Sequence, residues 1–367
     1  MLYLEAVVGA HQRAMDLGSS IAQMDYSVAD SVERAQGLFV KAHEVYTKTE
    51  LAYLRHRCNE RFQHSNDPMD PDDASALLSW HSSSLRRCES FISQGIARAE
   101  AGQEITQEFL LSEFRTRVKW PISRAIPDTE KVRSSADLKR GSQALGSQFM
   151  EHPLHSVGVA FTHMRSLDNH LRDHCAQLFD DAPNSYAAVQ DDALGLAREV
   201  EDVCAKAFED IAAILETLID KIWANEQKRN DFKLSNNDVS LKPTAACKRV
   251  TSLLTAVNRI LSSNIDASNA ASFGALVTST FANNLKIHVH KFSYTMTGGL
   301  RLKQDLSEYI AAAEIFQGSS AAISSLNRLA EACNLLVVQS SSVPGMLDNG
   351  FSIGAQEAEK LVQLRSS

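Results

Sequence analysis

The sequence lacks any uninterrupted apolar run of about 18 residues, the length that a membrane-spanning helix requires. The amino-terminal stretch, MLYLEAVVGAHQRAMDLG, also lacks the basic residues that begin a secretory signal, and it carries Glu5 and Asp16. We therefore expect a cytoplasmic protein that meets membranes only peripherally.

The motifs that accompany common enzymatic chemistry are missing as well. Neither glycine-rich phosphate-binding pattern, GxGxxG or GxxxxGK[ST], is present, and neither are the GxSxG elbow and the HExxH zinc motif. The six cysteines lie far apart and form no CxxC pair, which favours buried, reduced thiols over a zinc framework. We predict a non-enzymatic protein with no catalytic residues, no cofactor and no metal.

Positive charge is in short supply, with 37 Lys and Arg against 45 Asp and Glu and a formal net charge of −8. A general nucleic-acid-binding protein needs a basic face, so we expect no nucleic-acid partner. Binding to an anionic membrane surface needs a convergence of about four or more cations. Only short basic clusters exist along the chain: Arg55-His56-Arg57, Arg86-Arg87, Lys139-Arg140 and Lys228-Arg229.

Proline is scarce, with eight residues in the chain, and the stretches between prolines repeat apolar residues at the 3–4 spacing of a helix face. Because an interior proline costs a helix about 3 kcal/mol, the prolines outline the helices. Pro68 and Pro71 predict a linker near 64–72, and Pro153 predicts a further break. No alternating strand pattern is present. The sequence therefore predicts an all-α fold.

The chain divides into helical bundles in residues 1–180 and a C-terminal bundle in residues 184–367. In the first part, the spacing predicts helices over about 28–61 and 157–179. In the second part it predicts helices over about 185–226, from 243, and over about 270–297, 300–316, 321–338 and 355–364. Gly298 and Gly299 separate two of these helices, and we predict a hinge there with the positive φ that a helix C-terminus needs.

One alternative remains open, a helical metal protein or enzyme built on histidines. His163, His170 and His174 share one face of the helix predicted over 157–179, because they are spaced by seven and four residues. No acidic or cysteine motif accompanies them. Core or surface histidines are the simpler interpretation.

Four motifs in the second half form a recognisable set, which we call the family signature. They are NEQKRNDFK (225–233), FSY (292–294) followed by GGL (298–300) and DLSEY (305–309), ACNLLVV (332–338) and VQLR (362–365). Their order and gaps resemble those of the exocyst complex component 5 family, in its carboxy-terminal portion. The resemblance implies a structural signature at Phe232, Tyr294, Gly298, Gly299, Glu308, Tyr309, Cys333, Asn334 and Leu335.

The resemblance also implies architecture and function. Such proteins are elongated rods of stacked antiparallel helix bundles. The family scaffolds the exocyst, which tethers secretory vesicles to the plasma membrane before fusion. Other exocyst subunits, including the vesicle-side subunit that reads a Rab GTPase, are the implied partners, and small GTPases are further candidates. The implied location is cytoplasmic and peripheral, at sites of exocytosis. A recyclin-like F-box adaptor, which shares this helical region, is an alternative.

Overall fold

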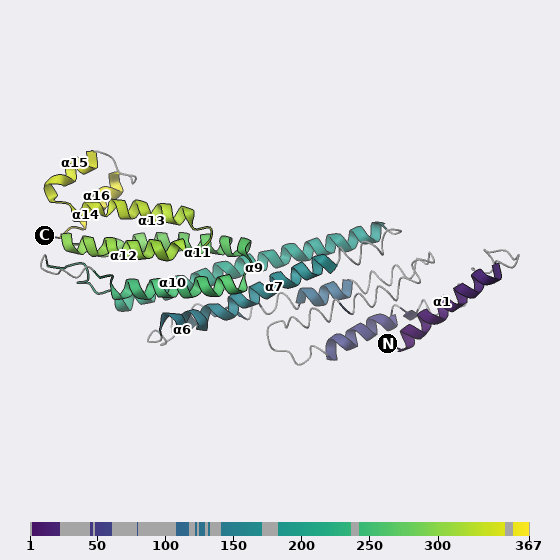
Figure 1. Ribbon diagram of the computed structural model, residues 1–367. Helices are drawn as coiled ribbons and strands as arrows, with labels where there is room; N and C mark the ends of the chain where they lie inside the picture. The colour runs from purple at the N-terminus through teal and green to yellow at the C-terminus, as the bar shows by residue number, and fades with distance from the viewer. Residues whose placement is uncertain are drawn as a thin grey trace. The chain divides into compact units, whose positions relative to one another are not determined.

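The computed structural model describes twelve parts of the chain, drawn with ribbons in Figure 1. These are residues 2–22, 45–46, 48–60, 79, 108–116, 122, 125–128, 131–132, 141–170, 183–235, 242–348 and 355–366. Their regular structure is helical, and within them no β-strand forms. An isolated β-bridge joins Tyr294 and Arg365. The predicted all-α fold is confirmed. No helix in the described segments has the length and apolar character needed to cross a membrane.

The chain forms two compact units, and each is discontinuous in sequence. Unit 1 comprises Met1–Ser123 and Val159–Cys204, and unit 2 comprises Arg124–Gly158 and Ala205–Ser367. Each unit thus draws on residues from both sides of the predicted boundary near 180–184. That boundary stays a prediction about folding domains, and the predicted linker near 64–72 lies outside the described residues.

Unit 1 begins with α1 (Leu2–Ala22), a helix that proline spacing did not predict. The helix predicted over 28–61 is present where the chain is described, over residues 48–60. Leu54 and Cys58 are buried on it, and the Arg55 guanidinium lies over the Phe109 ring at 5.6 Å from the centroid.

The break predicted at Pro153 is wrong. Residues 142–170 run without interruption through α6 (Ser142–Gly146), the π-helix η2 (Ser147–Glu151) and α7 (His152–His170). A proline removes one N–H donor and its ring clashes with the carbonyl four residues earlier. The π-helix directly before Pro153 has wider turns, with hydrogen bonds between residues five apart. These wider turns leave room for the proline ring within a continuous helix.

The longest described helix is α9 (Pro183–Glu226), and it confirms the predicted stripe. Its 44 residues extend about 66 Å at 1.5 Å per residue. It begins at Pro183, and proline is favoured at the first helical position. The apolar stripe is buried over most of its length, at Val200, Cys204, Ala207, Ile211, Leu215, Leu218 and Ile222.

The remaining labelled helices belong to unit 2. They are α10 (Ala245–Asn264), α11 (Ala267–Val289), α12 (Met296–Glu314), α13 (Ser320–Ala332), α14 (Asn334–Val337), η4 (Ser340–Ser342), α15 (Val343–Asp348) and α16 (Ala355–Gln363). Side-chain oxygens of Thr244, Asp266 and Thr295 cap α10, α11 and α12, and such caps each stabilise a helix by about 1 kcal/mol.

These helices pack along one another, as Figure 1 shows for α10 to α13. α10 packs against α6 and α12, and α13 packs against both α11 and α12. α14 packs against both α12 and α16. Phe208 and Trp223 of α9 pack against Phe273 and Phe281 of α11. The second half of α9 thus shares an apolar core with these helices.

The predicted hinge at Gly298 and Gly299 is wrong. α11 ends at Val289, the turn occupies residues 290–295, and both glycines lie in the first turn of α12. Among the described glycines, positive φ occurs at Gly318 (φ 76°), where the chain passes from α12 to α13. The predicted helix over 321–338 also divides, at Cys333, into α13 and α14.

We expect Leu215→Ala in α9 to lower the free energy of unfolding by about 2–5 kcal/mol, because it leaves a cavity in a closed core. Leu215 is 2% exposed, whereas Leu194 on the same helix is 50% exposed. Leu194→Ala is therefore the matched control and should change stability by less than about 0.5 kcal/mol. Urea unfolding followed by circular dichroism measures both. Equal effects would contradict the burial of the stripe.

Candidate functional site

Parts of the family signature that lie far apart in sequence meet at one end of unit 2. We call this meeting point the signature cluster and define it by Phe232, Tyr294, Gly298, Gly299, Leu335, Leu336 and Arg365. They come from the turn after α9, the turn before α12, α12 itself, α14 and the segment after α16. The cluster brings together four buried aromatic or aliphatic side chains with several backbone carbonyls.

Aromatic packing joins the first two motifs. The Phe232 ring lies 5.0 Å from the Tyr294 ring and 5.5 Å from the Phe292 ring, between centroids. The Thr295 N–H donates to the Phe232 carbonyl at 3.1 Å, and the Thr295 hydroxyl donates to the Leu234 carbonyl at 2.9 Å. The turn after α9 is therefore bound to the residue that caps α12.

Gly298 and Gly299 are required because neighbouring segments approach the α12 backbone closely, and neither glycine adopts positive φ. A Cβ at Gly298 would lie 1.7 Å from the Phe232 carbonyl oxygen, which is a backbone atom held by the hydrogen bond from Thr295. A Cβ at Gly299 would lie 3.0 Å from Leu336 Cβ on α14. The glycine pair thus lets two other segments touch the first turn of α12 from two sides.

Tyr294 connects the cluster to the end of the chain. Its N–H donates to the Leu364 carbonyl, and its own carbonyl accepts from Ser366, both at 2.8 Å. Its hydroxyl donates to the Val289 carbonyl at 2.8 Å. Burial raises the pKa of Tyr294 well above its usual value, so the phenol stays neutral and acts as a structural donor.

Arg365 ties the same terminal segment to α14. Its guanidinium donates to the Leu335 carbonyl at 2.9 Å and to the Val338 carbonyl at 2.6 Å, two acceptors at the end of α14. Charge-assisted bonds of this kind are stronger than neutral ones. Sequence reasoning included Arg365 in a motif without assigning it a role, because its partners are backbone groups.

Two further signature residues, Cys333 and Asn334, lie where α13 ends and α14 begins. Burial raises the pKa of the Cys333 thiol to about 12, so the thiol stays protonated and is not a nucleophile at neutral pH. Asn334 accepts from Lys303 Nζ at 2.7 Å. Leu335 packs in a small core with Val343 and Ala358.

Glu308 and Tyr309 lie outside the cluster and point to different surroundings. Tyr309 is buried, and its hydroxyl accepts from Trp223 Nε1 of α9 at 3.1 Å. Glu308 is exposed and lines a groove of about 460 Å³ between α10 and α12, together with small side chains such as Ala256 and Ala311. The signature motif DLSEY therefore serves both a core contact and a surface.

Asp305 of the same motif holds the start of α10. Its carboxylate accepts from the Thr244 N–H and from the Thr244 hydroxyl, both at 2.8 Å, and Thr244 in turn caps α10. Sequence reasoning quoted Asp305 but missed this role. The available signal was an acidic residue at a position of α12 that the helical spacing places on the buried face, since a buried carboxylate needs hydrogen-bond donors.

The histidine alternative gains no support where it is described. His163 and His170 are buried, and His163 meets the edge of Phe114 at 6.5 Å between ring centroids. His174 lies outside the described residues. In the described part of the chain, no group of three or more His, Cys, Asp or Glu side chains is placed to hold a metal ion.

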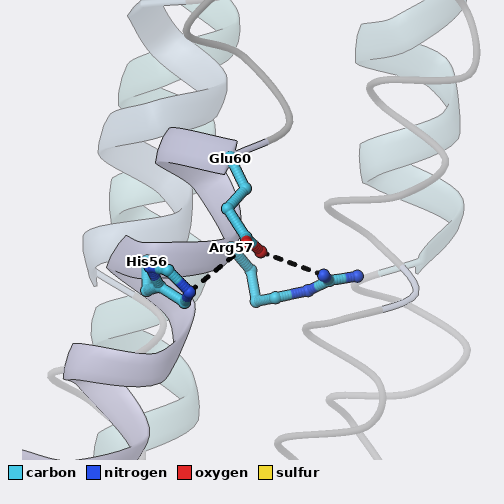
Figure 2. Close-up of polar contacts among 3 residues, drawn as sticks. All are labelled: His56, Arg57 and Glu60. Carbon is cyan, nitrogen blue, oxygen red and sulfur yellow. Dashed lines mark hydrogen bonds and ion pairs between the residues drawn. The ribbon is translucent and has the colours of Figure 1, made fainter.

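The basic cluster at residues 55–57 is engaged locally. Figure 2 shows Glu60 between His56 and Arg57, with contacts of 3.4 and 3.1 Å, and all three side chains are largely exposed. Exposed pairs of this kind contribute about 0–1 kcal/mol. The clusters at 86–87 and 139–140 lie outside the described residues.

The arrangement holds chain segments together through packed rings and hydrogen bonds to backbone carbonyls. The Tyr294 phenol of the cluster and the neighbouring Cys333 thiol are both neutral. A family model described as exocyst complex component Sec10-like, alpha-helical bundle, matches residues 41–366. The chain belongs to the Sec10-like exocyst component family. The resemblance carried by the four motifs is thereby confirmed.

Similar proteins agree with this assignment. Exocyst complex components SEC10a and SEC10b of Arabidopsis thaliana are each 28% identical over 166 residues, which is 44% of this chain and 20% of theirs. Exocyst complex component 5 of Oryza sativa subsp. japonica is 19% identical over 99% of this chain and 50% of its own length. The Sec10-like chain thus spans half or less of the curated relatives it matches.

We expect Gly298→Ala to destabilise this Sec10-like chain by about 1–3 kcal/mol, because the new methyl group meets a backbone carbonyl that cannot move aside. The matched control is Gly195→Ala on α9, where a Cβ meets nothing within 4 Å. The control substitution should leave the free energy of unfolding unchanged or raise it by about 0.5–1 kcal/mol, since alanine forms helices better than glycine does. Thermal unfolding of the two variants compares them. A stable Gly298→Ala protein would contradict the close approach.

Two buried titratable groups near the cluster have opposite effects on stability. Burial, with a smaller contribution from Lys291, lowers the pKa of His288 to about 4, and the ring stacks on Trp223 at 4.2 Å. Burial raises the pKa of Asp305 to about 6, although its hydrogen bonds with Thr244 oppose the rise. As pH falls from 6.5 to 4, the unfolded histidine takes up its proton before the folded one does, which lowers stability. In the folded chain, Asp305 takes up its proton first, between about pH 6 and 4, which raises stability.

We therefore expect the single variants to separate two effects that nearly cancel in the unmodified chain. Relative to that chain, Asp305→Asn should lose about 2–3 kcal/mol of stability on acidification from pH 7 to pH 4, and His288→Phe should gain a similar amount. Asparagine keeps an acceptor for the Thr244 N–H, so its pH-independent cost should be small. Urea unfolding at several pH values measures the slopes. Parallel curves for all three proteins would contradict the assignment.

Proposed function

We propose that this chain is a non-enzymatic scaffold subunit of the exocyst, in which it helps to tether secretory vesicles to the plasma membrane before fusion. The observation that carries the proposal is the match of the Sec10-like helical-bundle family over residues 41–366. The partners are other exocyst subunits, including the vesicle-side subunit that reads a Rab GTPase, with small GTPases as further candidates. The location is cytoplasmic and peripheral, at sites of exocytosis.

The physical properties of the helices suit such a role. α9 alone extends about 66 Å, and α10 to α13 pack along one another over a continuous core. Long helices packed in this way are stiff and offer extended surface, so they hold partners at a distance without any reaction. An elongated rod of stacked antiparallel bundles, with its folding boundary near 180–184, is the architecture that goes with this proposal.

The test is retention of exocyst subunits by the full 367-residue chain. The tagged chain, shown to be helical and monodisperse, is incubated with the purified remaining subunits, and the retained proteins are identified. We expect at least one exocyst subunit to be retained. Gly298→Ala serves as the control for fold dependence, since its local damage should weaken only contacts made by that end of unit 2.

Failure of the folded chain to retain any exocyst subunit would contradict the proposal. Retention of a ubiquitin-ligase core subunit instead would favour the recyclin-like adaptor. A Rab GTPase retained without the other subunits would place the chain directly at the vesicle side.

A further inference from the structure

Five cations gather around the signature cluster at one end of unit 2. We call this set the basic face, and its members are Lys228, Arg229, Lys233, Lys242 and Lys291. All five are exposed. Of this set, only Lys228 and Arg229 form a basic cluster in the sequence. The other three cations are single residues spread over 59 positions, from Lys233 to Lys291.

Contacts within the cluster bring these residues together. Lys233 follows Phe232 and Lys291 precedes Phe292, and those two rings lie 5.5 Å apart. Lys228 and Arg229 belong to the same turn as Lys233. On the other side, the Thr244 hydroxyl lies 3.4 Å from Gln227 Oε1, which brings Lys242, two residues before Thr244, to the start of that turn. The fold thus supplies the convergence that an anionic surface requires.

Among the described residues, two carboxylates, Asp231 and Glu226, lie within or directly before the turn that carries three of these cations. Asp231 Oδ2 accepts from Gln227 Nε2 at 2.7 Å and from the Lys228 N–H at 2.8 Å. Glu226 pairs with Arg249 at 2.9 Å. Asp231 keeps its negative charge because both of its donors are neutral, but the five cations outnumber it. The basic face thus keeps a local positive charge although the whole chain carries −8. Charges farther away than about 8 Å are largely screened at physiological salt, so the local excess decides what binds there.

Apolar side chains stand beside the cations. Met296 is 46% exposed and Leu300 is 37% exposed, and a spacing of four residues puts them on one face of the first turns of α12. Met296 directly follows Thr295, which is bonded to both carbonyls that flank Lys233. An exposed apolar pair next to several flexible lysines is the composition of a peripheral membrane-binding surface.

We propose that the basic face, with Met296 and Leu300, contacts an anionic lipid surface directly. Lysines provide point charges for phosphate and carboxylate headgroups, and the two apolar side chains enter the boundary between headgroups and acyl chains. A single-stranded nucleic acid fits less well, because it needs exposed aromatic platforms, and Phe232 and Tyr294 are buried. An acidic protein segment would leave the apolar pair unused.

This inference goes beyond the scaffold role, in which membrane association comes through the complex. The purified chain alone suffices to test it, so its outcome is independent of subunit retention. The probe is sedimentation of the full chain with large phosphatidylcholine vesicles that contain or lack phosphatidylserine, at low and high salt.

The decisive variant is Lys228→Gln/Lys233→Gln/Lys291→Gln. The matched control removes the same three charges elsewhere, at the exposed positions Lys48, Arg198 and Arg259, again by substitution with Gln. Each cation lost from the basic face should weaken binding to anionic vesicles about fivefold, so the triple variant should lose on the order of 100-fold. The control should bind within about twofold of the unmodified chain, because it removes the same number of charges and leaves all five cations of the basic face in place. A further variant, Met296→Gln/Leu300→Gln, should lose mainly the binding that persists at high salt.

Three results would overturn the proposal. One is absence of binding to phosphatidylserine vesicles by the folded chain at low salt. Another is equal loss of binding in the triple variant and its control, which would mean that net charge alone is responsible. The third is a triple variant that binds vesicles normally but loses an exocyst subunit in the retention assay, since the basic face would then be a protein-docking surface.

Discussion

The contact between the Phe232 carbonyl and the first turn of α12 is the constraint on which the end of unit 2 depends. No side chain fits at Gly298, because a Cβ there would lie 1.7 Å from that oxygen. The same carbonyl accepts a hydrogen bond from Thr295, whose side chain caps α12. This backbone oxygen thus links the position of the turn after α9 to the start of α12. Its close approach also requires glycine at position 298. The Phe232 ring, placed by this contact, then packs on Tyr294.

Around that contact, the polar groups of unit 2 are used to join segments. Arg365 donates to the Leu335 carbonyl of α14 and to the carbonyl of the next residue after that helix. Asp305 accepts from the residue that caps α10, and Trp223 donates to Tyr309 across the core. An unmet buried polar group would cost about 1–3 kcal/mol, so each of these bonds restricts the alternatives that the helices could adopt. These bonds lie inside the unit, whereas the cations of the basic face are exposed.

The periodic parts of the sequence were predictable, and the exceptions have local causes. The stripe of α9 has regular spacing over seven buried positions, so its helix followed from the pattern. Pro153 misled because a π-turn, which has no sequence signal, precedes it. Gly298 and Gly299 misled for a different reason. Glycine is used both for positive φ and for close approach, and only a neighbour in space distinguishes the two uses. That neighbour, Phe232, is 66 residues away in sequence.

The sequence by itself determined the all-α class, the presence of the longer helices in the last third of the chain and membership of the Sec10-like family. These follow from periodicity and from short ordered motifs, both of which are local in sequence. Tertiary structure alone decided that the motifs meet in one cluster, that Glu308 and Tyr309 serve different surroundings, and that five scattered cations share one face. The physical reason is that hydrogen bonds, ring contacts and electrostatic potential depend on distance in space, and distance in space is set only when helices pack.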